Sequence, residues 1–327
     1  MKKSEYKDRV PISKNNICIY RDEEKCTKCG ACKGICKSRI GVYDHYDMKS
    51  AKEVICINCG QCSLVCPNGS IQEVKDYKKV IKEIKNGKTV IVQISPAARF
   101  LVGDEFGYKP GKNVLGKIVS GLKLLGVKSV VDTTFGADLT IVEEGNELIK
   151  RIKNNANLPL FTSCCPAWVK YLETFYPEYV KNLSTTKSPI QMTGAIIKNY
   201  YANKLNLKDV SVVAVVPCTA KKYEITKSDD VDYAITVREL VSWFKEEKIN
   251  FRKLKSSQID ALTGTSAGLI FGSSGGVTEA MIRYVYHHLT GNNPPKKLLN
   301  FEFYSICRTF KSNLLLKKYV DKSGYIC

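Results

Sequence analysis

The sequence predicts two kinds of structure in succession, a small α+β domain and a larger α/β domain with parallel strands. The first follows from a repeat of cysteines within residues 1–78, and the second from apolar strands that alternate with helices after Tyr77. At 327 residues the chain is long enough for two or three domains, each with its own core. No apolar run approaches the ~18–20 residues of a membrane span, so none is expected.

The cysteine repeat occurs twice within the first 78 residues. "CTKCGACKGIC" (26–36) recurs as "CINCGQCSLVC" (56–66), and the flanking apolar stretches ICIYR and SIQEV are typical of small strands. Three cysteines of each CxxCxxC loop can converge on one 4Fe–4S cluster, and the fourth cysteine of each run reaches the other cluster. The repeat therefore predicts a two-cluster 4Fe–4S ferredoxin-like domain. The ligands expected for one cluster are Cys26, Cys29, Cys32 and Cys66, and those for the other are Cys56, Cys59, Cys62 and Cys36.

Zinc is the alternative occupant, because two CxxC pairs also suit a zinc site. Eight cysteines in two runs of four favour iron–sulfur clusters. Cys18 lies outside the repeat and is expected to be a buried structural thiol. The N-terminus is basic but has no apolar signal stretch, and fourteen cysteines in a reducing compartment indicate metal rather than disulfides. We therefore expect a cytoplasmic protein.

The net charge of +19 suggests an acidic partner. The lysines are dispersed along predicted helices such as 74–88, without a helix-turn-helix signature or a basic motif with spaced aromatics, so nucleic acid is not expected. An acidic ferredoxin or another redox protein is the expected partner, and a partner subunit is possible. The alternative is a lysine-rich surface that is merely solvated.

The α/β part begins with a buried parallel strand in KTVIVQISPAARF (88–100) and continues through a predicted helix, strand, helix and strand, at 114–126, 129–136, 137–152 and 158–164. A second lobe is expected to begin near Lys187. It consists of a helix, an apolar strand and two further segments, at 187–204, 210–218, 232–247 and 263–289. The predicted lobes are ~79–186 and ~187–300, each with parallel strands, and residues 301–327 form an atypical tail.

Three cysteines follow the predicted strands of this part. Cys164 and Cys165 end the strand 158–164, and Cys218 ends the strand 210–218. Ligands of parallel sheets lie beyond the carboxyl ends of the strands, which is where these thiols are expected. Neighbouring side chains on a strand point to opposite faces, so Cys164 and Cys165 are suited to two separate roles.

Five stretches of this part resemble the iron-only (FeFe) hydrogenases, and the resemblance covers essentially residues 20–290. They are FGADLTIVEE (135–144), TSCCPAW (162–168), LSTTKSP (183–189), VPCTAKKYE (216–224) and SGGVTEAMIR (274–283). The resemblance implies an FeFe-hydrogenase-like α/β domain over residues 79–300. It also implies a third 4Fe–4S cubane, joined through a cysteine to a two-iron subcluster that carries CO and cyanide.

The resemblance also implies roles for individual residues. Cys165 and Cys218 match cubane ligands, while Cys164 stays free and relays protons to the two-iron centre. Lys221 is expected to donate a charge-assisted hydrogen bond to a cyanide. The family's proton-relay positions fall on Glu144, Glu147, Ser184 and Glu224. The alternatives are a solvated helix face for the two glutamates of 137–152 and a surface pair for Lys221 and Lys222.

The chain departs from the family at its C-terminal motif, Glu-x-Met-Ala-Cys-x-x-Gly-Cys, which supplies two more cubane cysteines and is absent. Cys307 and Cys327 lack the neighbouring glycines and the preceding Glu-x-Met, so they are poor substitutes. Val216 and Thr278 replace the usual methionines, and Ile190 replaces glutamine. We interpret the hydrogenase-like domain as C-terminally truncated, with a weakened catalytic cluster.

Two functions compete on this sequence. The first is reversible H2 formation from protons and ferredoxin-delivered electrons, with residues 26–66 as the electron path. The second is a non-catalytic iron–sulfur protein, an electron carrier, sensor or assembly factor on a decayed hydrogenase domain. The resemblance to the hydrogenases favours H2 formation, but the two missing cluster ligands predict little or no H2 turnover by this polypeptide.

Overall fold

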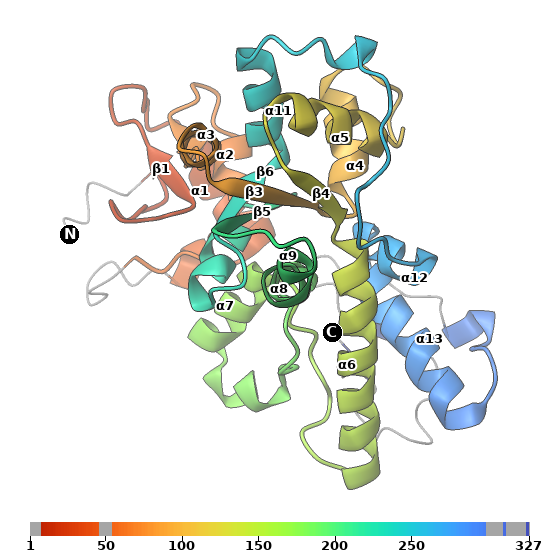
Figure 1. The fold of residues 1–327 in the computed structure, drawn as a ribbon. Coiled ribbons are helices and arrows are strands. Elements are labelled where there is room, and N and C mark those ends of the chain that lie inside the picture. The colour runs from red at the N-terminus through yellow and green to blue at the C-terminus, as the bar shows by residue number, and fades with distance from the viewer. Residues whose placement is uncertain (1–7, 46–53, 299–309, 312–324, 327) are drawn as a thin grey trace.

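The computed structural model describes residues 8–45, 54–298, 310–311 and 325–326. A four-stranded sheet lies at its centre, in the order β4-β3-β5-β6, and all three pairings between neighbouring strands are parallel (Figure 1). Within it Val92 of β3 pairs with Val130 of β4 and with Val213 of β5. The strand bounds are β3 Thr89–Ile94, β4 Ser129–Asp132, β5 Val210–Val216 and β6 Tyr233–Thr236.

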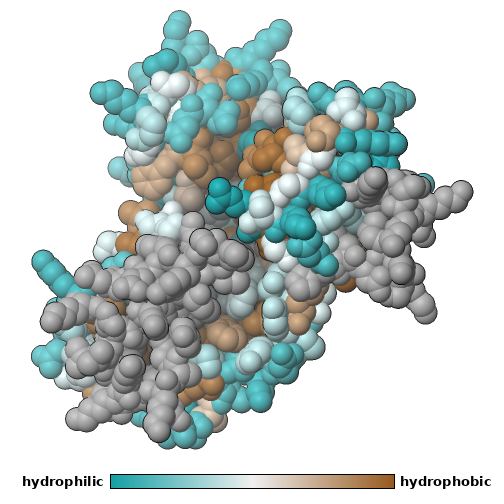
Figure 2. All heavy atoms as spheres, turned by 180° about the vertical axis from the view of Figure 1, so that it is seen from behind, coloured by the Kyte–Doolittle hydropathy of each residue, from teal (hydrophilic) through white to brown (hydrophobic). Residues whose placement is uncertain are grey.

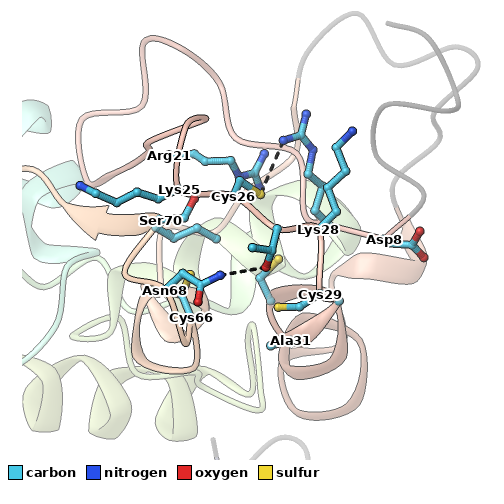
Figure 3. Close-up of a pocket in the computed structure, with 15 residues that line it drawn as sticks. Asp8, Arg21, Lys25, Cys26, Lys28, Cys29, Ala31, Cys66, Asn68 and Ser70 are labelled. Atoms are coloured by element: carbon cyan, nitrogen blue, oxygen red, sulfur yellow. Dashed lines mark hydrogen bonds between the residues drawn. The ribbon is translucent and has the colours of Figure 1, made fainter.

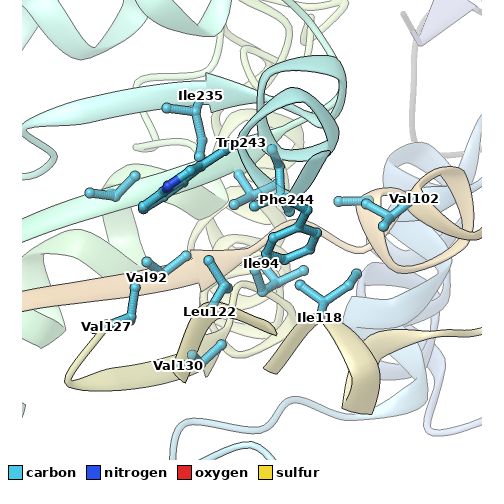
Figure 4. Close-up of a cluster of buried hydrophobic side chains, with 14 of the residues drawn as sticks. Val92, Ile94, Val102, Ile118, Leu122, Val127, Val130, Ile235, Trp243 and Phe244 are labelled. Atoms are coloured by element: carbon cyan, nitrogen blue, oxygen red, sulfur yellow. The ribbon is translucent and has the colours of Figure 1, made fainter. Parts of the chain in front are cut away.

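The central strands β3 and β5 are mostly apolar and are buried along almost their whole length because helices cover both faces of the sheet. On one face Val90, Val92 and Ile94 of β3 point into a core that contains Trp243 and Phe244 (Figure 4). This core is closed by the helices α3 Tyr77–Lys85, α4 Ala98–Glu105, α5 Leu115–Leu124 and α11 Val237–Glu246. Alternate residues of β3 therefore belong to one face, as the two-residue period of a strand requires.

The other face of the sheet is covered by α8 Pro189–Ile196 and the π-helical turn η5 Ile197–Tyr201, which α9 Ala202–Lys204 continues. Here Ile91 of β3 packs with Ile190 and Ile197. The long helix α6 Thr134–Asn154 runs beside α8, α12 Ser266–Leu269 and α13 Gly276–Thr290. A Cβ at Gly136 would lie 2.3 Å from the carbonyl oxygen of Pro189, so α6 and α8 approach this closely only because residue 136 is glycine.

Residues 8–45 and 54–74 form the N-terminal module, which lies beside the β5–β6 side of the sheet (Figure 1). Strand β1 Ile19–Arg21 pairs antiparallel with β2 Ile71–Glu73, as the two flanking apolar stretches predict. The two cysteine loops share one backbone feature, since Lys28 and Gly30 and their counterparts Asn58 and Gly60 all have positive φ. The helices that follow these loops are α1 Ala31–Ile35, η2 Cys36–Ile40, η3 Tyr43–His45 and α2 Gln61–Leu64.

The remaining described elements are short, apart from one helix beside the cysteine doublet. They are α7 Pro166–Phe175, η4 Pro177–Asn182, α10 Lys221–Glu224, η6 Ile225–Lys227, η7 Phe251–Lys253, η8 Ile270–Gly272, η9 Lys296–Leu298, β7 Phe310–Lys311 and β8 Tyr325–Ile326. Within the described ranges, no helix combines the length and the apolar character needed to cross a bilayer. Hydrophilic residues are spread over the coloured part of the face seen in Figure 2 rather than gathered in one patch.

Two sequence-based expectations about this part are wrong. The segment 158–164 is not a strand: Phe161 makes only an isolated bridge to Leu183, while Leu158 and Leu160 pack against α6 and α13. Pro159 has no amide hydrogen to donate to a sheet, which disfavours a strand here. Strands from both predicted lobes also join one sheet, since β3 pairs with β4 and with β5. Separate parallel sheets on either side of Lys187 are therefore not present among the described residues.

Candidate functional site

The N-terminal module brings the first predicted quartet of cysteines around one pocket. Cys26, Cys29 and Cys32 come from the loop and first turn of α1, and Cys66 follows α2 (Figure 3). The Val10 amide lies 3.5 Å from the Cys32 sulfur, and Arg9 Nη1 lies 3.7 Å from the Cys26 sulfur. Cys66 thus lines the same pocket as the first cysteine loop, and the crossed assignment of the four cysteines to one cluster stays a prediction.

The surroundings of Cys26 favour its thiolate form. Burial acts to raise the pKa of this thiol, but hydrogen bonds from the Lys28 amide, Arg9 and Ser70 outweigh burial, and the pKa lies below its ordinary value. A thiolate is the form that ligates iron. The pocket is therefore suited to a metal cluster at this position.

The second quartet surrounds a neighbouring pocket with an apolar wall that includes Ile19 and Val42. Its cysteines are Cys36, Cys56, Cys59 and Cys62. Burial raises the pKa of Cys59 to about 12 and also raises those of Cys56 and Cys62. Such thiols ionise readily only when a bound metal takes the place of their protons. In the described part of the chain, no three His, Cys, Asp or Glu side chains lie close enough together to hold a single metal ion.

The cysteine doublet lies at the start of α7. Cys165 is the exposed N-cap residue of this helix, and Cys218 follows β5. Burial raises the pKa of Cys218, and the charge of Cys165 raises it further, so the two thiols lie within electrostatic reach of each other. Cys218 is therefore at the strand end predicted for it, whereas Cys165 is positioned by a helix terminus rather than by a strand.

The Cys164 thiol lies within electrostatic reach of charged side chains. Burial raises the pKa of its thiol to about 12, the Glu144 carboxylate adds to this effect, and the Lys221 ammonium opposes it. The thiol is consequently protonated at neutral pH. The expectation that the two adjacent cysteines point to opposite faces of a strand loses its basis, because 158–164 is not a strand, and their separate roles stay a prediction.

Two glutamates of α6 interact with Ser184, and the charge of one of them, Glu144, acts on Cys164. Glu144 is 1% exposed, and burial raises its pKa to about 7 against hydrogen bonds to Ser184 and the Ser163 amide. Ser184 Oγ donates to Glu147 Oε2 at 2.8 Å, and Glu147 Oε1 is 2.5 Å from Arg151 Nη2. The common face predicted for Glu144 and Glu147 is present, and a fully solvated helix face is excluded for both. Sequence reasoning missed Arg151, although its i,i+4 spacing from Glu147 was a usable signal.

A second chain of polar contacts approaches from the turn after Cys218. Lys221 Nζ donates to the Cys164 carbonyl oxygen at 2.8 Å and to Glu224 Oε2 at 2.5 Å, and Ser188 Oγ donates to Glu224 Oε1. Burial acts to lower the pKa of Lys221, but the Glu224 carboxylate outweighs it, so the pKa is raised and the side chain is an ammonium. Lys221 is thus not part of an exposed pair. Glu224 and Ser188 also line an open cavity of about 350 Å³, which Ser184 shares.

The N-terminal module contacts the turn after Cys218 directly. Thr219 Oγ1 donates to the Asn58 carbonyl oxygen at 2.7 Å, and a Cβ at Gly60 would lie 2.4 Å from the same hydroxyl. Cys59 and Cys36 pack in one apolar cluster with Cys218. The second cysteine pocket is therefore next to the site that contains Cys165 and Cys218.

The remaining predicted residues fall into two groups. Cys18 is fully buried, as a structural thiol should be, and burial raises its pKa to about 12. Ile190, Val216 and Thr278 are also buried. The two C-terminal cysteines, Cys307 and Cys327, lie outside the described residues.

Comparison with known proteins identifies the family. The profile described as "Iron only hydrogenase large subunit, C-terminal domain" matches residues 88–321. The chain belongs to the iron-only hydrogenase family. It is 40% identical to the NADP-reducing hydrogenase subunit HndD of Solidesulfovibrio fructosivorans, over 85% of this chain and 53% of that protein, so it spans about half of this relative.

A solved structure and a second kind of relative extend this comparison. A variant of the [FeFe]-hydrogenase HydA1 from Chlamydomonas reinhardtii superimposes with a TM-score of 0.60 and 36% identity, over 68% of this chain and 60% of that one. The chain is also 29% identical to the cytosolic Fe-S cluster assembly factor narfl of Danio rerio, over 62% of this chain and 53% of that protein. The hydrogenase-like domain thus has relatives of two functional kinds.

Proposed function

We propose that this chain is an iron–sulfur oxidoreductase of the FeFe hydrogenase type, which couples protons and ferredoxin-delivered electrons reversibly to H2. The observation that carries the proposal is the position of Cys164. Its thiol lies within electrostatic reach of the buried Glu144 carboxylate and of the Lys221 ammonium, which also donates to the Cys164 carbonyl oxygen, and it is adjacent in sequence to the cluster-binding candidate Cys165. A free thiol in contact with a relay of acids is suited to proton transfer at a metal centre.

The N-terminal module acts in this proposal as a two-cluster 4Fe–4S ferredoxin-like domain. Two observations support it: the crossed cysteine quartets around two pockets, and the repeated backbone of the two loops. The contact of the second pocket with Cys218 would let electrons pass toward the catalytic site. An acidic ferredoxin or another redox protein would supply them, in the cytoplasm.

The third cofactor of the family, a 4Fe–4S cubane with a two-iron CO and cyanide subcluster, supplies the chemistry that joins two protons and two electrons into H2. Cys165 and Cys218 would hold its cubane, and the exposed Cys165 and the half-buried Cys218 fit thiolate ligation. The Lys221 ammonium can donate to an anionic cyanide. Cys164 holds a proton at neutral pH, and Glu144, with a pKa of about 7, can accept or release one.

The described residues offer two of the four thiolates that such a cubane takes. We therefore propose that H2 turnover by this 327-residue chain alone is impaired, unless further cysteines or a partner subunit complete the ligand set. The alternative is a non-catalytic iron–sulfur carrier, sensor or assembly protein, and the narfl relative favours that alternative. A non-catalytic protein of this kind requires the iron–sulfur clusters but does not require the proton relay of acidic side chains at Cys164.

The test is anaerobic coexpression with hydrogenase maturation factors, followed by iron analysis, EPR and an H2 assay with reduced ferredoxin. The hydrogenase proposal predicts weak H2 formation that disappears in Cys164→Ser, while the iron content of the variant is unchanged. Glu143→Gln, an exposed neighbour on α6, serves as the control and keeps the native rate. Loaded clusters without any H2 turnover would instead support the non-catalytic alternative.

A further inference from the structure

A buried ionic cluster outside the cysteine and relay sites joins three segments that are distant in sequence. The Lys222 side chain is 2% exposed, and its Nζ lies 2.6 Å from Asp76 Oδ2 and 2.7 Å from Glu239 Oε2. The same ammonium donates to the Ala234 carbonyl oxygen at 3.0 Å. All three donor positions of the lysine therefore have partners.

The partners of Lys222 come from the junction between the N-terminal module and the sheet. Asp76 lies between β2 and α3, in the connection that leaves the module, and Glu239 lies in the first turn of α11. Glu239 Oε1 accepts the amides of Asp76 at 2.6 Å and Tyr77 at 3.3 Å, while Oε2 accepts the Thr236 amide at 2.8 Å. The carboxylate of Glu239 thus fixes the connection and caps α11 at once.

Lys222 belongs to the same turn that carries the site residues. Thr219, earlier in the turn, donates to Asn58 of the second cysteine loop, and Lys221 donates to the Cys164 carbonyl oxygen. Adjacent lysines therefore point in two directions, one toward the candidate catalytic site and one toward the junction. The turn 218–224 contacts the module at Asn58 and, at Asp76, the connection that leaves the module.

We propose that Lys222 is a positioning residue that fixes the second cysteine pocket relative to Cys218. This inference rests on the proposed function, in which electrons pass between clusters at these two places. A buried ammonium is stabilised only when its carboxylates lie at set positions and directions, whereas two apolar surfaces can slide past each other. The ionic cluster therefore specifies one docking geometry between the N-terminal module and the turn 218–224. Because electron transfer slows steeply with distance, a fixed separation of the two cluster sites has a functional use.

The test measures the docking geometry directly, by pulsed EPR distances between two spin labels on non-natural amino acids. The labels replace Tyr20 of β1 and Tyr200 of η5, which are 39% and 59% exposed, so the fourteen cysteines are left untouched. Lys222→Met alone leaves two buried carboxylates without their shared cation and is prone to misfold. The decisive variant therefore combines Lys222→Met with Asp76→Asn, because the amides that bind Glu239 remain.

The native chain should give one narrow distance distribution. The double variant should fold, with a thermal midpoint close to native, and give a distribution at least twice as broad. Lys198→Met is the control, since it removes an ion pair of 2.9 Å to Asp232 at the opposite end of β6, and it should keep the narrow distribution. A folded double variant with the native distribution overturns the proposal, as does a double variant that cannot fold, which would make Lys222 a requirement of folding alone.

The distance measurement does not need bound iron, so it remains informative if the proposed function fails. Iron analysis of the native chain tests the proposed function separately. Where the clusters load, the spin–spin interaction between the two clusters of the module should be the same in the native chain and the double variant. A broader distance distribution between the labels, with an unchanged spin–spin interaction inside the module, would show that only the junction has changed. A general loss of structure would alter both measurements.

Discussion

Glu144→Gln should change the dependence of stability on pH in a calculable way. Burial raises the pKa of Glu144 from 4.5 to about 7, so the native state binds a proton that the unfolded state has released between these values. Stability is therefore lost as the pH rises through this window, because deprotonation is favoured by unfolding. For this shift, the cost in free energy of unfolding grows from about 1 kcal/mol at pH 5 to about 3 kcal/mol at pH 8.

The assay is urea unfolding of the native chain and of Glu144→Gln under reducing, anaerobic conditions, followed by circular dichroism between pH 5 and pH 8. Glutamine carries no charge at either pH, so the variant should become more stable relative to the native chain by about 2 kcal/mol across this interval. Glu143→Gln, at the exposed neighbouring position, is the matched control and should follow the native curve. Parallel curves for the native chain and Glu144→Gln would refute a buried, protonated Glu144.

Three further predictions follow from single contacts. Ser184→Ala removes a hydrogen bond that lowers the pKa of Glu144, so the pH midpoint of the native stability curve should move upward. Gly60→Ala places a Cβ 2.4 Å from a threonine hydroxyl at φ 72°, and should cost about 2–4 kcal/mol in urea unfolding. Gly69→Ala, at φ 59° with nothing within 4 Å, should cost only about 1 kcal/mol. Cys66→Ser should remove the EPR signal of the cluster bound by the first cysteine loop and leave that of the second loop, whereas loss of the second signal would reject the crossed pairing.

Local pattern was sufficient to predict much of this structure. The cysteine loops are short, so their spacing predicts which three sulfurs of each loop meet, and Cys66 lines the pocket of the first loop. The apolar runs of β3 and β5 predict buried parallel strands because both faces of the sheet are covered. The i,i+3 spacing of Glu144 and Glu147 likewise predicts their shared direction.

Contacts between distant segments could not be predicted in this way. The apolar stretch 158–164 looks like a strand, yet its leucines are used against α6 and α13, and periodicity does not distinguish these outcomes. Nothing local shows that β3 pairs with β5 across more than a hundred residues and so joins the two expected lobes. Lys222 looks like one member of a surface pair until its carboxylate partners, Asp76 and Glu239, are brought to it by the fold.

Hydrogen–deuterium exchange between H2 and D2O tests the central claim most directly. It requires a metal centre and a proton relay but no external electron donor, so it isolates the site around Cys164 from the electron path. For the chain coexpressed with maturation factors, the account predicts formation of HD that is slow in the native protein and lost in both Cys164→Ser and Glu144→Gln. HD formation that is unaffected by either substitution would contradict the proposed proton relay.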